Sequence, residues 1–149
     1  MNNLVRVINS FFSKDEDYEL MTVLSNTSAI IYQLYDNINW VGFYLLKNDI
    51  LHLGPFQGKP ACMKIPLNKG VCGYSARNKK SIIVNDVHNF EGHIACDSAS
   101  NSELVIPIII NNTLFGLLDI DSPSLNRFTD DDLLMFQTII DSIIPHIKK

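Results

Sequence analysis

Residues 54–121 read GPFQGKPACMKIPLNKGVCGYSARNKKSIIVNDVHNFEGHIACDSASNSELVIPIIINNTLFGLLDID and contain all three cysteines of the chain. The cysteine-bearing part is crowded with Gly, Pro, Asn and Asp, a composition that is typical of loops, and apolar segments flank it on both sides. Loops carry chemistry when a rigid scaffold positions them. The stretch therefore predicts a thiol site on loops above a small sheet.

The segments around the cysteines predict an α+β fold. Asn48-Asp49 and Asn111-Asn112 separate runs of apolar, β-branched and aromatic residues, which is the pattern of β-hairpins. Ser13 and Glu16 form a capping box that predicts the start of a long N-terminal helix. The expected strands are 40–46, 50–56, 81–84, 103–110 and 113–121; the expected helices are 4–12, a long one ending near Tyr35, and 130–147, capped by Thr129 and open to early termination at Pro145. We expect an antiparallel sheet with the N- and C-terminal helices packed on one face.

Length and charge narrow the class of protein. A chain of 149 residues suits one domain, 1–149, and 46% hydrophobic with 19% charged residues suits a globular one. A net charge of −4 gives no electrostatic footprint for nucleic acid. The apolar runs are too short to span a bilayer, and the N-terminus lacks a signal-peptide pattern. We therefore expect a cytoplasmic protein, whose thiols rest reduced and whose disulfides are transient.

The surroundings of Cys72 favour a reactive thiol. Two glycines flank it closely, and Lys69, Arg77 and Lys79 supply positive charge. If a helix begins near Gly70, the unpaired N–H groups of its first turn favour the thiolate of Cys72.

Cys62 and Cys96 also lie in polar surroundings. Cys62 lies between two lysines, and Cys96 follows His88 and His93, which could stabilise a thiolate or be plain surface residues. A lone cysteine is most often a small buried hydrophobe. Three cysteines in polar, Gly-rich loops favour redox chemistry instead.

Three carboxylates are predicted to converge near the thiols. Asp119 and Asp121 are two apart on a strand and so share a face. The hairpin turn brings Glu103 close to both. Like charges placed opposite one another repel, so three converging acids are unfavourable in a sheet that is only structural. These acids are therefore either solvated residues at strand ends or part of a functional site. A site of this kind would bind a cation such as an ammonium, or keep one carboxyl protonated as a general acid.

The strings GPFQGKPACMKIP, GVCG, DVHNFEGHIACDSASNSE and GLLDIDSP occur in this order, and together they resemble the free methionine-(R)-sulfoxide reductase family. Members of this family are built on a GAF domain. The resemblance runs from INWVGFYLL, beginning at Ile38, to the final helix. It implies a GAF-like catalytic domain that reduces free methionine-(R)-sulfoxide with thiols and without a cofactor, and it implies a homodimer.

The resemblance also implies roles for the candidate residues. Trp40 and Tyr44, four apart on a strand, match the aromatic pocket for the methyl group of the substrate, and Glu103, Asp119 and Asp121 match substrate-binding and catalytic acids. We assign Cys96 as the nucleophile because it is nearest in sequence to Glu103 and the histidines. Cys62 is then the resolving thiol and Cys72 an auxiliary thiol or the alternative nucleophile. A thioredoxin-type dithiol would reduce the resulting intramolecular disulfide.

Two alternatives come from other classes of protein. A non-catalytic GAF-type sensor would bind a small molecule in the same cavity without turnover. A structural zinc site would use Cys62, Cys72, Cys96 and a histidine, but the closely spaced ligand pair usual in zinc sites is absent from the sequence.

Overall fold

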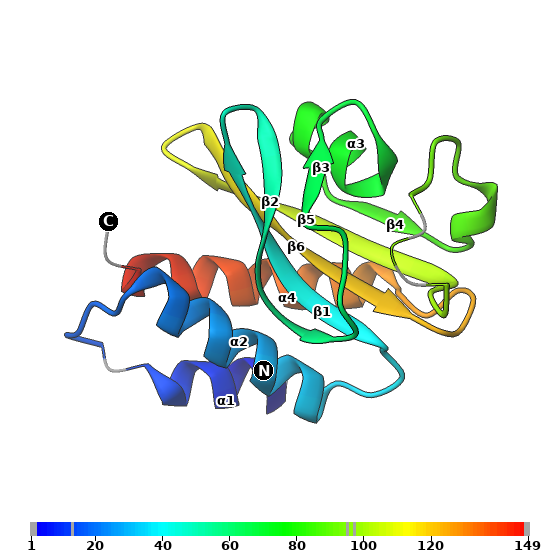
Figure 1. Cartoon of the computed structure of the whole chain (residues 1–149). Coiled ribbons are helices and arrows are strands. Elements are labelled where there is room, and N and C mark those ends of the chain that lie inside the picture. The colour runs from blue at the N-terminus through cyan, green and yellow to red at the C-terminus, as the bar shows by residue number, and fades with distance from the viewer. Residues whose placement is uncertain (1–2, 13, 95, 97, 148–149) are drawn as a thin grey trace.

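A computed structural model describes residues 3–12, 14–94, 96 and 98–147 of the chain. Its centre is a six-stranded sheet in the order β3-β2-β1-β6-β5-β4 (Figure 1). Every pair of neighbouring strands is antiparallel. The strands are β1 (Trp40–Lys47), β2 (Ile50–Gly58), β3 (Lys64–Pro66), β4 (Ile82–Val84), β5 (Ser102–Ile110) and β6 (Thr113–Ser122).

Helices cover the two faces of this sheet unequally. On one face lie α1 (Asn3–Phe11), α2 (Leu20–Leu34) and α4 (Asp130–Ile143), which a 3₁₀ turn, η2 (Ile144–His146), follows (Figure 1). The opposite face carries α3 (Gly70–Asn78) together with the loops that hold the cysteines and the 3₁₀ turn η1 (Val87–Asn89). The expected antiparallel sheet with terminal helices on one face is therefore confirmed. Among the described residues, no helix combines the length and apolar character needed to cross a membrane.

The period of two along each strand divides the core into two parts. Val41 and Phe43 of β1 are fully buried toward α1, α2 and α4. Trp40 and Tyr44 point to the opposite face, where a second cluster packs around α3. The same alternation sends Leu104, Ile106, Ile108, Leu118 and Ile120 of β5 and β6 to the first cluster, and Val105 and Leu117 to the second. Every candidate acid is odd-numbered and so belongs to the α3 side.

Both predicted hairpins are confirmed, with turns formed by the expected residues. Asn48, Asp49, Asn111 and Asn112 all have positive φ, between 53° and 63°. This conformation at both central residues is the type I′ turn, whose twist matches that of the flanking strands. Asn and Asp adopt it at lower cost than other non-glycine residues.

Two helix limits and one strand differ from expectation. The long N-terminal helix begins at Leu20, because Tyr18 donates its backbone N–H to the carbonyl of His146 and holds the chain extended there. Ser13, the predicted cap, lies outside the described residues. The last helix ends at Ile143, since Pro145 follows and cannot donate a backbone hydrogen bond. The short strand β3 was not expected from its sequence.

Candidate active site

A pocket lies between the sheet and α3, on the face opposite the terminal helices. Its lining comes from β1, β5, β6, the first turn of α3, and the segments that bear Cys62 and Cys96. It contains about 40 Å³ of space for water, enough for a few water molecules. That volume is small for a ligand of the size of methionine.

Aromatic rings form one wall of the pocket. Trp40 and Tyr44 are each 2% exposed, and their ring centroids lie 6.0 Å apart. The ring of Phe56 stacks on Trp40 from β2 at 5.4 Å. Gly42 makes this arrangement possible, because a Cβ there would lie 2.6 Å from the Trp40 ring and 2.4 Å from the Cβ of Phe56. The predicted shared face of Trp40 and Tyr44 is confirmed, and both line the pocket.

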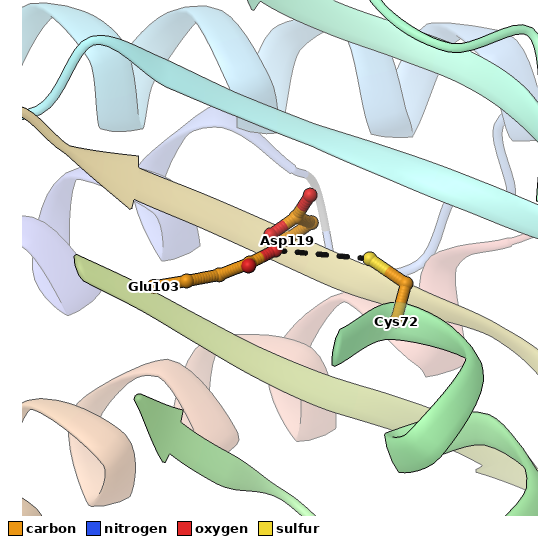
Figure 2. Close-up of side chains that lie close together, drawn as sticks. All are labelled: Cys72, Glu103 and Asp119. Carbon is orange, nitrogen blue, oxygen red and sulfur yellow. Dashed lines mark hydrogen bonds between the residues drawn. The ribbon is translucent and has the colours of Figure 1, made fainter. Parts of the chain in front are cut away.

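The three predicted acids meet at the floor of the pocket. Glu103 on β5 pairs directly with Asp121 on β6, and Asp119 lies two residues before Asp121 on the same face. The side chains of Glu103 and Asp119 lie close together (Figure 2). Each is only 6% exposed. Burial raises the pKa of Glu103 well above its ordinary value, and the nearby negative charges of Asp119 and Asp121 raise it further. Burial and these neighbouring charges therefore both favour the protonated form of Glu103.

Asp119 is the more easily ionised member of this pair. Burial raises its pKa, but hydrogen bonds from Glu103 and Cys72 act in the opposite direction. Its Oδ1 atom is buried and has no hydrogen-bond partner in the structure. The pocket thus combines a proton donor with an acceptor oxygen that a cationic ligand could satisfy.

Cys72 lies where α3 was predicted to begin, yet its environment is the reverse of the one expected. The helix does start at Gly70, but Cys72 is buried against the acids rather than placed in a polar loop. Its Sγ lies 3.9 Å from Oε2 of Glu103 (Figure 2). Burial raises the pKa of Cys72 well above its ordinary value, and Asp119, Glu103 and Asp121 raise it further. The prediction of a thiolate at Cys72 is wrong, because desolvation and adjacent acids outweigh the helix N-terminus.

Cys62 and Cys96 form a disulfide across 34 residues of sequence, with their Cα atoms 5.5 Å apart. Cys62 lies between β2 and β3, and Cys96 lies in the loop that follows η1. Cys96 lines the pocket. With their sulfurs bonded to each other, Cys62 and Cys96 are not available as thiolate ligands, so the four-ligand zinc site of the sequence hypothesis is not assembled. The ligand atoms of Cys72, Glu103 and Asp119 do lie within 4.8 Å of one another.

The two loop histidines have different positions. His93 lines the pocket, and its pKa is lowered, first by burial and then by His88. Both effects favour the neutral ring, which carries no positive charge to stabilise a thiolate. His88 is exposed and its Nε2 lies 2.9 Å from Oδ1 of Asn101, outside the pocket lining.

Some pocket residues carried no recognisable chemical signal in the sequence. Ser100 is 6% exposed and accepts a hydrogen bond from Nδ2 of Asn39 at 3.1 Å. Ala61, Ile65, Val71 and Ile94 complete the lining. Apolar and hydroxyl residues in loops have many possible roles, and only the fold brings these to one cavity. Ser100 did fall within one of the strings that carry the family resemblance.

Known proteins share this architecture and much of this sequence. A family model described as GAF domain matches residues 19–144, so fold and sequence agree on a GAF domain. The Escherichia coli protein named free methionine-R-sulfoxide reductase is 54% identical over 112 residues, which cover 75% of this chain and 68% of that protein. The chain belongs to the free methionine-R-sulfoxide reductase family of GAF-domain proteins, which confirms the resemblance seen in the sequence.

Solved structures agree with this assignment. The reduced form of fRMsr of Staphylococcus aureus is 45% identical with a TM-score of 0.91, covering 97% of this chain and 93% of that chain. The free methionine-R-sulfoxide reductase of Neisseria meningitidis, in complex with its substrate, is 34% identical with a TM-score of 0.89, covering 96% of this chain and 85% of that chain.

Proposed function

We propose that this protein reduces free L-methionine-(R)-sulfoxide to L-methionine, through a sulfenic acid on Cys96 and a disulfide between Cys96 and Cys62. The observation that carries the proposal is the Cys62–Cys96 disulfide beside a pocket that is lined by aromatic rings and by a buried acid, Glu103, whose pKa is raised. The names of its relatives support the same reaction. The whole chain, 1–149, would act as one catalytic domain.

The pocket offers a complement to each part of the substrate. The methyl group would lie against Trp40 and Tyr44, whose flat rings provide an apolar wall. The ammonium would pair with the carboxylates of Asp119 and Asp121. The first turn of α3 lines the pocket, and the backbone N–H groups of Val71 and Cys72 there would suit the carboxylate of an amino acid.

The chemistry then needs a nucleophile, a proton source and a second thiol. The sulfur of Cys96 attacks the sulfoxide sulfur while Glu103 protonates the oxygen, and methionine leaves as the hydroxyl is transferred to Cys96 as sulfenic acid. The thiol of Cys62 attacks that sulfur, forming the disulfide and releasing water. A thioredoxin-type dithiol restores both thiols by exchange. The raised pKa of Cys72 favours Cys96 over Cys72 as the attacking sulfur.

The proposed reaction also indicates the cellular compartment in which the protein acts. A disulfide that must be reduced after each turnover suits a reducing compartment, so we place the protein in the cytoplasm. We also propose a homodimer formed through the helical face. Support comes from large exposed hydrophobic side chains on α1, α2 and α4: Phe11, Met21, Tyr32, Leu34 and Leu134.

Substrate selectivity tests the proposed function. We expect turnover of the free R epimer with a dithiol as reductant, and rates at least about 100-fold lower for the free S epimer and for R-sulfoxide within a peptide. The small volume of the pocket leaves little room for a peptide chain, and only one epimer would present its oxygen to Glu103. Methionine formation is measured by chromatography. Ligand retention without turnover of either epimer would favour the non-catalytic sensor.

A further inference from the structure

The segment that bears Cys62, residues 59–63, is anchored to the wall of the pocket by two side chains. The indole Nε1 of Trp40 donates a hydrogen bond to the carbonyl of Lys59 at 3.1 Å. The hydroxyl of Tyr44 donates to the carbonyl of Cys62 itself at 2.8 Å. Both rings are 2% exposed and stack against each other, so the two donors have fixed positions.

Two further ties hold the segment. Met63 accepts a hydrogen bond from the backbone N–H of Leu53, and the disulfide ties Cys62 to Cys96. When the disulfide is reduced, that last tie is lost. Among the contacts that the structure records, the hydrogen bond from Tyr44 is then the direct side-chain contact with the main chain of Cys62.

Tyr44 is suited to remain a donor throughout the reaction. Burial raises the pKa of its phenol above the ordinary value, and Asp119 and Cys72 raise it further. The hydroxyl therefore stays protonated at any pH at which the thiols react. The carbonyl of Cys62 would lose its partner if this hydroxyl were absent, which weakens the closed position of the segment.

We propose that Tyr44, with Trp40, is a positioning residue for the resolving cysteine: the aromatic wall holds the main chain at Cys62 so that its thiol faces the sulfur of Cys96. This inference rests on the proposed function, in which Cys62 resolves the sulfenic acid on Cys96. The step it assists forms the S–S bond and breaks the S–O bond, and the thiol proton leaves with the hydroxyl as water. One wall thus serves both the methyl group of the substrate and the second thiol.

The test compares two steps in the same sample of Tyr44→Phe, which keeps the ring and removes only the hydroxyl. Reduced protein is mixed with one equivalent of R-sulfoxide and quenched over time, and methionine, disulfide and trapped sulfenic acid are quantified. We expect disulfide formation to slow about fivefold more than methionine release, the effect of one neutral buried hydrogen bond, with sulfenic acid accumulating. A merely structural defect would slow both steps together.

Two further variants make the result specific. Tyr35→Phe removes a buried hydroxyl from the opposite core, where the ring packs against Phe136, and is expected to match the wild type in both steps. Pro60→Gly makes the backbone more flexible between the anchored carbonyls of Lys59 and Cys62, and it leaves both aromatic side chains unchanged. It is expected to slow disulfide formation about threefold relative to methionine release.

An equilibrium measurement separates this inference from the proposed function because it requires no sulfoxide. At a fixed ratio of oxidised to reduced glutathione, the ratio of disulfide to dithiol is expected to fall about fivefold in Tyr44→Phe and to stay constant in Tyr35→Phe. An unchanged ratio in Tyr44→Phe, or equal slowing of both kinetic steps, would overturn the inference. Failure of the wild type to form methionine would instead reject the proposed function.

Discussion

Replacing Cys96 with serine is expected to lower methionine formation by about 10³-fold or more. A serine hydroxyl is a far weaker nucleophile than a thiolate at neutral pH, and the proposed sulfenic acid cannot form on it. The variant should still fold, because the side chains are of similar size. Methionine released in a single turnover is the measurement, with unfolding temperature as a check on structure.

The other two cysteines serve as matched controls. Cys62→Ser is expected to release one equivalent of methionine and then stop, with sulfenic acid retained on Cys96. Cys72→Ser is expected to release methionine more slowly than the wild type, because Cys72 contacts Glu103, and still to form the disulfide. A Cys96→Ser protein that releases a full equivalent, beside a Cys72→Ser protein that releases none, would make Cys72 the nucleophile.

Glu103→Gln is expected to reduce the rate at neutral pH about 100-fold, the lower end of the range for general acid catalysis. Glutamine has the shape of the protonated acid but cannot give a proton to the sulfoxide oxygen. Because the pKa of Glu103 is raised, the acid keeps its proton to a higher pH than an ordinary carboxyl group and loses it as pH rises further. The wild-type rate should therefore fall on the alkaline side, and this fall should vanish in the variant.

The control for Glu103→Gln is Glu91→Gln, which alters an exposed carboxyl on the loop leading to Cys96. It is expected to have the wild-type rate and pH profile. The pH dependence of kcat/KM, measured for the wild type and both variants, decides whether Glu103 is the proton donor. An alkaline fall that persists unchanged in Glu103→Gln would show that another group supplies the proton.

Much of the fold and half of the site could be predicted from the sequence because both depend on local rules. Paired Asn and Asp residues determine the hairpin turns, and a two-residue turn sets the register of the strand residues next to it. In the β5–β6 hairpin that register alone would place Glu103 opposite Ile120. A bulge beside Ile108 and Ile109 shifts it by one residue, so that Glu103 lies opposite Asp121, with Asp119 on the same face. The same period of two placed Trp40 and Tyr44 together.

The roles of the thiols could not be predicted in this way, because they depend on tertiary packing. A Cβ at Gly73 would lie 2.9 Å from the carbonyl oxygen of Leu67, so α3 lies very close to the preceding segment. That close packing buries Cys72 beside Glu103, where sequence neighbours such as Lys69 no longer determine its pKa. The contact between Cys62 and Cys96 spans 34 residues of sequence that include helix, strand and loop, with no local signal.

The most direct test is to map the disulfides of the wild-type protein after one equivalent of free methionine-(R)-sulfoxide. Reduced protein is allowed one turnover, free thiols are alkylated, and the digested peptides are identified by mass spectrometry. We predict one methionine released per disulfide formed, a single linked peptide pair containing Cys62 and Cys96, and Cys72 alkylated as a free thiol. Release of methionine with Cys72 in the disulfide, or with all three thiols still free, would contradict the proposed mechanism.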